Sequence, residues 1–466
     1  MKILFVMRFA VPIHSYRDII RALAGHRHDI KILFDRKWFG RTPTDDLDAL
    51  KREVPLFDYG WAHAREDRWR FVVFPVRQIA SWRRYFFVEQ SRFFLDRWHA
   101  LFPVWLKTLM RIPFVPIFFR SPMGGKFLEK LEEKTPPDAA ILSQIQKEKP
   151  DIVVVPVANM RYGAVDVDYG KGARALKIPL VSIVLSWDSV ATKGLVQPMP
   201  DRMLVWNRAQ EEEAIAHHRI PRERIRFIGA PVFDKWFGHV ASLSPREVFC
   251  GTHNLNPKHP ILLYLGSSGN VATNELWLIK ELKHALDAAS DERLRNMQLV
   301  VRPHPGNAQN YRYFNLPNTI VLPREGALPD KPESFQLFYD SLVHSVASVG
   351  IYTSGMIDAL IVDRPVIALV RKEFSQTQEE AQYFKSIRAS GAIEEAHHWE
   401  ELYPMLTRLL EGRDKKKEKR ADFVRTFIRP RGEHMSASEA VRVELEDLII
   451  SFIPENFAYK TDRFYR

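Results

Sequence analysis

The chain has 466 residues, of which 46% are apolar and 27% are charged, a composition typical of a globular protein with two or three domains. Cys250 is the only cysteine, so an intramolecular disulfide and a cysteine-based zinc site are excluded, and a cytoplasmic location is expected. The net charge of +11 favours anionic partners such as phosphates, nucleic acid or an acidic membrane surface.

The chain begins MKILFVMRFAVP, an apolar run that Arg8 interrupts and that no small-residue cleavage site follows. These features argue against a signal peptide, so Lys2 to Met7 is interpreted as a first strand. A helix from Ser15 to Ala24 and a second strand from Asp29 to Phe34 complete a βαβ pattern, which predicts a parallel sheet. Residues 36–60 are expected to form a polar loop. No run of about 18 apolar residues is present, so no membrane-spanning helix is expected.

Residues 68–120 interrupt the βα pattern with arginines and lysines that alternate with aromatic residues, and only Glu89 and Asp96 oppose this positive charge. We expect an amphipathic helix from Ser81 to Met110. Helices of this composition lie in membrane interfaces, with arginines such as Arg83 and Arg84 on anionic lipid phosphates. The alternatives are a helical subdomain packed on the core and, less favoured, a groove for single-stranded nucleic acid.

The βα pattern resumes at Asp138 and continues to Ile228. A second series of nearly continuous apolar strands begins at Pro260, which fits a sheet that is covered on both faces. We therefore predict an α/β protein with two doubly wound domains facing a cleft. Its expected parts are an N-terminal domain (1–235) with an insertion at about 68–130, a linker (236–259), a C-terminal domain (260–445) and a tail (446–466).

Ligands of doubly wound sheets bind at the carboxyl ends of the strands, so the candidate residues are sought there. After the first strand of the C-terminal domain comes a small polar loop suited to phosphate or sugar oxygens. It consists of Gly266, Ser267, Ser268, Gly269 and Asn270. After the second strand come Arg302 and His304, in a turn that two prolines stiffen, and either side chain could face a diphosphate.

A third turn, Thr353-Ser354-Gly355, follows the strand from Ala347 to Tyr352 and begins a helix. A helix N-terminus offers backbone N–H groups and a positive dipole end to an anion. Asp358 lies one turn further on, where its carboxylate could accept hydrogen bonds from ribose hydroxyls. The pattern suits a nucleoside diphosphate, although an ordinary capped βα turn would look similar.

The N-terminal domain offers two candidates for a catalytic base. His14 lies in the loop after the first strand, and Asp188 follows a later strand in the sequence Ser186-Trp187-Asp188. The pairs His217-His218 and His397-His398 are expected on the surface. The sequence has no HExxH, Walker-type P-loop or GxGxxG motif, which argues against a zinc hydrolase, a P-loop ATPase and a simple NAD enzyme.

The order of RPHP, then YTSGMIDAL and DRPVIAL, resembles the nucleotide-binding half of GT-B glycosyltransferases. The resemblance is nearest to the subgroup of CDP-glycerol glycerophosphotransferases and UDP-N-acetylglucosamine 2-epimerases, and it covers residues 1–35 and 137–445. It implies that Ser354, Gly355 and Asp358 hold donor diphosphate and ribose, with Arg302 and His304 near the phosphates. The chain departs from the glycerophosphotransferases at Ser186-Trp187-Asp188, where they have His-Gly-Thr.

The resemblance implies a glycosyltransferase that moves a sugar from a nucleotide diphosphate to a lipid-linked or saccharide acceptor. We expect neither a metal nor another cofactor, because the helix N-terminus and Arg302 or His304 can stabilise the leaving diphosphate. The expected location is cytoplasmic, with peripheral attachment to the inner face of the membrane through residues 68–120. The alternatives are a CDP-glycerol-type polyol-phosphate transferase, a sugar-nucleotide epimerase and a non-catalytic binding module.

Overall fold

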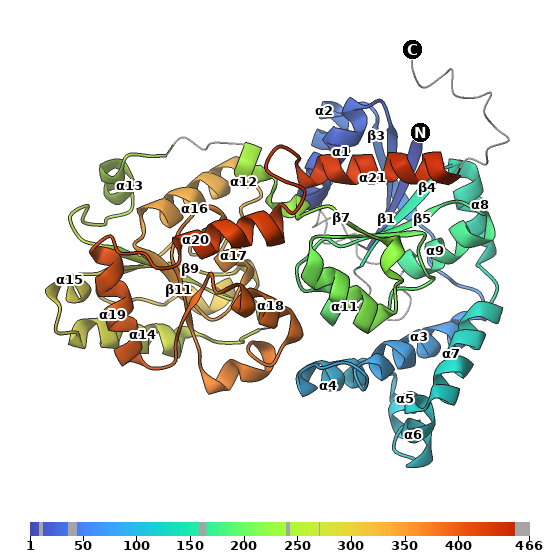
Figure 1. Cartoon of the computed structure of the whole chain (residues 1–466), viewed down its shortest axis with the longest axis horizontal. Helices are drawn as coiled ribbons and strands as arrows, with labels where there is room; N and C mark the ends of the chain where they lie inside the picture. Colours follow the sequence, from blue (N-terminus) through green and yellow to red (C-terminus); the bar gives the residue numbers. More distant parts are fainter. Residues whose placement is uncertain (9–12, 36–43, 158–164, 239–242, 270, 453–466) are drawn as a thin grey trace. The chain divides into compact units, whose positions relative to one another are not determined.

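The computed structural model describes residues 1–8, 13–35, 44–157, 165–238, 243–269 and 271–452 (Figure 1). The chain forms two compact units. The first unit comprises Met1–Asp234 and the chain from Phe427 onward, and the second comprises Lys235–Thr426. The second unit begins at Lys235, and residues 427–445, which were expected in the C-terminal domain, belong to the first unit.

The first unit is built on a parallel sheet of seven strands in the order β3-β2-β1-β4-β5-β6-β7. The strands are β1 (Lys2–Met7), β2 (Asp29–Asp35), β3 (Phe57–Ala62), β4 (Ile152–Pro156), β5 (Leu180–Ile183), β6 (Arg202–Val205) and β7 (Ile225–Phe227). The central strands are nearly continuous buried apolar runs, as expected for a sheet with both faces covered. The predicted parallel sheet is therefore confirmed.

The prediction of a loop over residues 36–60 is wrong for the part that the structure describes. Helix α2 (Thr44–Glu53) and the edge strand β3 lie there. Only the first and last residues of β3 are fully buried. Because an edge strand of this kind lacks a continuous apolar run, its sequence resembles a loop.

Helices α1 (Ile13–Gly25) and α21 (Ala437–Phe452) pack side by side on the first unit (Figure 1). Leu445 and Leu448 of α21 belong to the same buried cluster as β1, β2 and β4. The remaining βα helices are α8 (Ala139–Glu148), α9 (Val165–Ala175), α10 (Ser189–Thr192) and α11 (Arg208–His218). The last helix of the chain thus completes the core that the first strands begin.

The insertion forms five helices instead of one long one. They are α3 (Arg70–Arg84), α4 (Arg92–Ala100), α5 (Val104–Leu109), α6 (Phe114–Arg120) and α7 (Pro122–Lys134). The prediction of a single helix from Ser81 to Met110 is wrong, because Ser91 begins α4 with a side-chain cap and Pro103 begins α5. In the described residues no helix is long and apolar enough to cross a membrane.

The second unit has a parallel sheet of six strands in the order β10-β9-β8-β11-β12-β13. The strands are β8 (Ile261–Leu265), β9 (Gln298–Arg302), β10 (Thr319–Val321), β11 (Ala347–Gly350), β12 (Val366–Leu369) and β13 (Glu394–Ala396). Helices α14 (Leu276–Ala288), α16 (Pro332–His344), α17 (Ser354–Ile361), α18 (Gln382–Ser390), α19 (Trp399–Leu410) and α20 (Lys417–Phe423) accompany them. Two parallel sheets with helical connections confirm the predicted α/β fold.

Candidate functional site

The loop after β8 is organised by a buried carboxyl group. Glu275 accepts hydrogen bonds from the backbone N–H of Ser267 (2.8 Å), from the Ser267 hydroxyl and from the hydroxyl of Tyr264 (2.8 Å). Asn307 donates to the Ser267 carbonyl (2.9 Å). The hydroxyl of Ser267 is therefore occupied by its hydrogen bond to Glu275, and the residue stabilises the conformation of the loop.

The other residues of this loop lie closer to solvent. Ser268 is half-buried and Gly269 is exposed. The backbone N–H of Gly266 donates to the carbonyl of Arg302 (2.9 Å), which joins the first loop to the second. Asn270 lies outside the described residues.

Arg302, the last residue of β9, is a buried cation with spare hydrogen-bonding capacity. Its side chain is 5% exposed, its Nη2 donates to the carbonyl of Ala327 (2.8 Å), and its guanidinium lies 4.3 Å from the ring centroid of Phe338. Burial lowers its pKa to about 10, against the opposing effect of Asp358 and Asp330, so it stays charged at neutral pH. Its Nη1 has no partner among the described residues. A buried donor without a partner is costly, and an anion would satisfy it.

His304 is positioned as a neutral hydrogen-bond donor. Its Nδ1 accepts from the backbone N–H of Gly306 (3.0 Å), and burial lowers its pKa. A neutral ring that accepts at Nδ1 carries its proton on Nε2. His304 can therefore donate one hydrogen bond to a ligand at the carboxyl end of β9.

Helix α17 begins in the predicted turn. Thr353 is its N-cap residue but makes no side-chain cap, and the Thr353 hydroxyl has no partner among the described residues. Ser354 is exposed at the first helical position, followed by Gly355. Gly350, at the end of β11, has a φ of 154°, and a Cβ there would lie 2.6 Å from the carbonyl oxygen of Leu265. Glycine is therefore required for β11 to end this close to β8.

Asp358 has a partner within the second unit that the sequence did not indicate. The indole N–H of Trp236 donates to its Oδ1 (2.7 Å), and the Trp236 ring packs against Phe335 at 4.5 Å. Burial raises the pKa of Asp358 to about 6, although Lys235, Trp236 and Arg302 act against this rise. Trp236 was assigned to a linker, and its bond to a residue 122 positions away leaves no signal in the local sequence.

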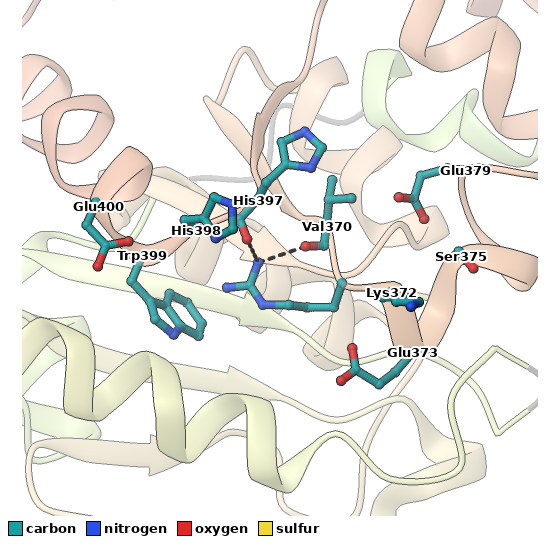
Figure 2. A pocket seen from close by; sticks show the side chains of 10 residues that line it. Val370, Lys372, Glu373, Ser375, Glu379, His397, His398, Trp399 and Glu400 are labelled. Atoms are coloured by element: carbon teal, nitrogen blue, oxygen red, sulfur yellow. Dashed lines mark hydrogen bonds between the residues drawn. The ribbon is translucent and has the colours of Figure 1, made fainter.

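A pocket of about 590 Å³ opens at the carboxyl ends of β12 and β13 (Figure 2). Arg371 crosses it, donating to the carbonyls of Val370 and His397 (both 2.8 Å) and covering the ring of Trp399 at 4.3 Å. His397 and His398 are exposed at this pocket, which confirms their predicted surface location. Because carboxyl ends of parallel strands share one edge of the sheet, this pocket opens at the same edge as the three candidate loops.

In the first unit, Asp188 lies between β5 and α10. It accepts from the hydroxyls of Ser186 and Thr192 (3.0 Å for Thr192), and Lys193 Nζ lies 3.8 Å from it. Burial raises the pKa of Asp188, but Lys193 and the two hydroxyls outweigh burial and hold that pKa below its usual range. Asp188 is therefore ionised at neutral pH. His14 is in helix α1, and its side chain lies outside the described residues.

The prediction that His217 and His218 lie on the surface is wrong, because both are buried on α11. His218 donates from Nε2 to the carbonyl of Val190 (2.8 Å) and accepts at Nδ1 from the N–H of Val196 (3.0 Å). Burial lowers the pKa of both rings, that of His217 to about 3. Their helix has a mixed polar sequence, so its buried face could not be recognised from periodicity.

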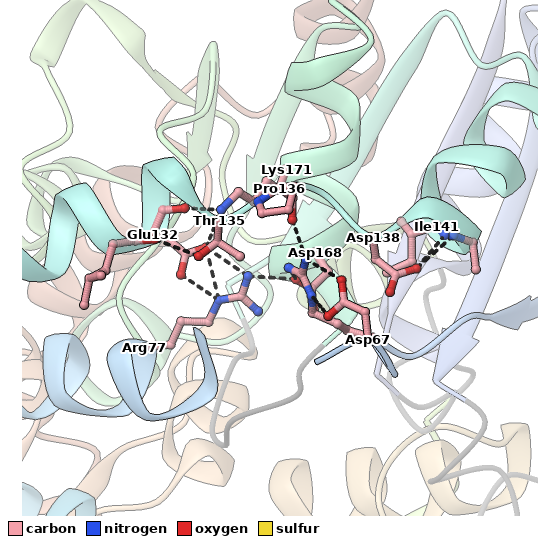
Figure 3. A network of polar contacts seen from close by, with 12 residues as sticks. Asp67, Arg77, Glu132, Thr135, Pro136, Asp138, Ile141, Asp168 and Lys171 are labelled. Atoms are coloured by element: carbon pink, nitrogen blue, oxygen red, sulfur yellow. Dashed lines mark hydrogen bonds and ion pairs between the residues drawn. The ribbon is translucent and has the colours of Figure 1, made fainter. Parts of the chain in front are cut away.

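The base of the insertion is held to the first unit by a network of buried charges (Figure 3). Arg77 donates to Asp168 (2.7 Å) and to Glu132 (2.9 Å), and Arg65 donates to Asp168 (3.2 Å). Lys171 pairs with Glu132 at 3.3 Å. These side chains join α3, α7 and α9, so part of the positive charge of the insertion is neutralised inside the protein.

The expectation that Arg83 and Arg84 face lipid is wrong. Both side chains are buried. Arg84 donates to the carbonyl of Lys193 and to the hydroxyl of Tyr85 (2.7 Å), and Arg83 donates to the carbonyl of Ser121 (3.1 Å). These arginines fix α3 to the loop after α10 and to the start of α7.

No family model and no curated protein matches the sequence. Solved structures match it over nearly its whole length. The S. aureus MnaA protein, solved with UDP, is 11% identical with a TM-score of 0.51, over 97% of this chain and 98% of its own. The UDP-GlcNAc 2-epimerase of Methanocaldococcus jannaschii, solved with UDP-GlcNAc and UDP, is 14% identical with a TM-score of 0.51, over 96% and 100%.

The calicheamicin glycosyltransferase CalG4 is 12% identical with a TM-score of 0.49, over 97% of this chain and 99% of its own. Similarity to the MnaA and Methanocaldococcus jannaschii structures at these levels of identity establishes a common fold and leaves the reaction open. The two parallel sheets, their strand orders and the full-length matches lead to one conclusion: the chain has the GT-B fold, with two Rossmann-like units.

Proposed function

We propose that this protein is a glycosyltransferase that moves a sugar from a nucleotide diphosphate to a membrane-associated, glycolipid or polysaccharide acceptor in cell-envelope glycan synthesis. The observation that carries the proposal is the buried guanidinium of Arg302, whose Nη1 has no partner among the described residues. The group lies within electrostatic range of Asp358 on α17, the helix whose exposed first residue is Ser354. A diphosphate would satisfy the guanidinium and the helix N-terminus together.

The proposed chemistry stabilises the leaving group. Negative charge grows on the diphosphate as the sugar departs, and Arg302, the Nε2–H of His304 and the N-terminus of α17 would lower the energy of that charge. The hydroxyls of Thr353 and Ser354, the loop from Gly266 to Asn270 and the backbone of Gly355 would complete the phosphate contacts. The Oδ2 of Asp358 would accept from ribose, while Oδ1 accepts from Trp236.

The proposed base is Asp188 or His14. Asp188 is ionised at neutral pH, but a carboxylate with a lowered pKa is a weak proton acceptor. To act as a base, Asp188 would have to accept a hydrogen bond from the acceptor hydroxyl in addition to, or in place of, those from Ser186 and Thr192.

A sugar-nucleotide epimerase is the second candidate, favoured by the name of the matching Methanocaldococcus jannaschii structure. A CDP-glycerol-type transferase is the third, on the resemblance of the motifs alone. An epimerase would convert its sugar nucleotide with no acceptor present, whereas either transferase would release nucleotide only when acceptor is added. Proton NMR of UDP-GlcNAc incubated with the purified chain alone separates the epimerase from the two transferases.

The donor site is tested with Ser354→Asp. An acidic residue at the first position of α17 suits the helix dipole, so the fold should be kept, but the added charge repels a diphosphate. We expect calorimetry to show at least about tenfold weaker binding of the preferred nucleotide, chosen from UDP, CDP, GDP and dTDP derivatives. Thr44→Asp, at the first position of α2, is the matched control and should bind like wild type. Equal affinity of wild type and Ser354→Asp would contradict the site, and no binding to any nucleotide would contradict the function.

A further inference from the structure

We propose that the outer end of the insertion docks into the headgroup region of an anionic membrane. This surface, called the insertion tip below, comprises α5, α6 and the first turns of α7, residues 104–127. The inference deepens the proposed function, on which its biological role rests, because it names the surface that would bring the enzyme to a membrane-bound acceptor.

The insertion tip exposes apolar side chains that would ordinarily be buried. Six large ones have half or more of their surface exposed: Val104, Trp105, Ile112, Phe114, Ile117 and Met123. Helix α6, with the sequence FVPIFFR, has no buried residue at all among those described. A helix that is apolar on every side needs an apolar environment, and clustered exposure of this kind marks an interaction surface.

The tip carries only positive charge. Residues 97–128 contain five arginines or lysines and no aspartate or glutamate. Arg111 and Lys126 are exposed within the apolar surface, and Lys107 is partly exposed. Aromatic rings at headgroup depth with cations on lipid phosphates are the arrangement that interfacial helices adopt. A protein partner would have to supply an equally apolar surface with the opposite charge.

The tip is also placed to reach a surface outside the first unit. Within the first unit, α5 and α6 lie at the end of the insertion farthest from the sheet, beyond α3 and α7 (Figure 1). Leu106 and Met110 are buried, so one side of α5 is anchored while Trp105 and Leu109 remain outside. The buried charges of Arg77, Asp168 and Glu132 hold the base of the insertion in place. The tip is thus an apolar surface at the end of an insertion whose base is fixed by buried ion pairs.

Vesicle sedimentation with the full chain tests the inference. We expect binding to vesicles of equal parts phosphatidylglycerol and phosphatidylcholine, and much weaker binding to phosphatidylcholine alone. The double variant Trp105→Ser/Phe114→Ser should bind the anionic vesicles at least about tenfold more weakly, because Phe114 is 79% exposed and Trp105 55% exposed. A second variant, Arg111→Glu/Lys126→Glu, should lose binding while the apolar surface is kept.

Matched controls change equally exposed residues of the second unit. Tyr313→Ser, at a residue that is 84% exposed, and Lys258→Glu should bind vesicles like wild type. Unchanged thermal unfolding of every variant excludes misfolding as the cause. Absence of wild-type binding, or equal binding by the tip variants, would overturn the inference. So would self-association of wild type that the tip variants abolish without any vesicle binding, which would make the tip an interface between copies. Nucleotide affinity, measured on the same samples, reports separately on the donor site.

Discussion

Glu213 is a carboxyl group buried on α11 in the first unit, and its Oε2 has no partner among the described residues. Burial, with a smaller contribution from the negative charge of Asp188, raises the pKa of Glu213 to about 8. The group therefore keeps its proton at neutral pH. A neutral carboxyl next to an ionised one is the arrangement that limits repulsion between them.

Comparison of Glu213→Gln with wild type should reveal this bound proton through the pH dependence of the free energy of unfolding. Between pH 5 and pH 8 the folded wild type holds a proton that the unfolded chain has lost, so its stability falls as the pH rises, by up to about 1.4 kcal/mol per pH unit. Glutamine is neutral throughout. We expect urea unfolding at pH 5, 6, 7 and 8 to show that the free energy of unfolding of the variant rises relative to that of wild type at each pH step. Glu212→Gln, at an exposed neighbour, should parallel wild type. If the free energies of unfolding of Glu213→Gln and wild type differed by the same amount at every pH, the pKa of Glu213 would not be raised.

The positions of single residues of the candidate site could be predicted where strand ends and helix starts fix them. Their burial and hydrogen bonds could not be predicted where contacts with distant parts of the sequence determine them. Arg302 and Ser354 end a strand and begin a helix, so the rule for strand ends located both. The bond from Trp236 to Asp358 and the burial of His218 depend on elements far apart in the sequence. Ser267 was correctly placed in a loop, but the sequence did not show that Glu275 would take its hydroxyl.

Among the elements, the insertion shows most clearly that a charge pattern in the sequence does not reveal which charged side chains are buried. Its basic and aromatic residues were read as one amphipathic surface. The structure divides them, with Arg77, Arg83 and Arg84 inside the base and Arg111 and Lys126 outside at the tip. Periodicity could not separate these groups, because α3 buries its arginines together with apolar side chains such as Val73 and Trp82.

Arg77→Met tests whether the buried network holds the base of the insertion. The change removes the cation that joins α3 to Asp168 and Glu132, leaving buried carboxylates with fewer partners. We expect the free energy of unfolding to fall by about 3 kcal/mol or more. Arg92→Met, at an exposed arginine 3.6 Å from Asp96, should change it by at most about 0.5 kcal/mol. Similar small losses for both variants would mean that Arg65 and Lys171 suffice to satisfy the carboxylates.

At the scale of the whole molecule, the chain enters the second unit at Lys235 and returns to the first at Phe427. The parallel sheets and the two-unit division could be predicted, because two separate series of βα alternation indicate them. The return could not, since a C-terminal helix carries the same pattern whichever unit it packs on. The contacts of α21 with α1 and with the core of β1, β2 and β4 assign it to the first unit.

Leu445→Ala should therefore weaken the first unit and leave the second unchanged, although the residue follows the second unit in the chain. Leu445 is 0% exposed in the core that includes Ile3 and Phe5, and leucine-to-alanine changes at such sites cost about 2–5 kcal/mol. Hydrogen–deuterium exchange should become faster in peptides of β1, β2 and α1, with no change in β8, β9 and β11. Ile450→Ala, at a residue of the same helix that is 69% exposed, should leave both units as in wild type. Faster exchange confined to the second unit would place α21 there after all, and the chain would then have the simple two-domain order that its βα pattern suggests.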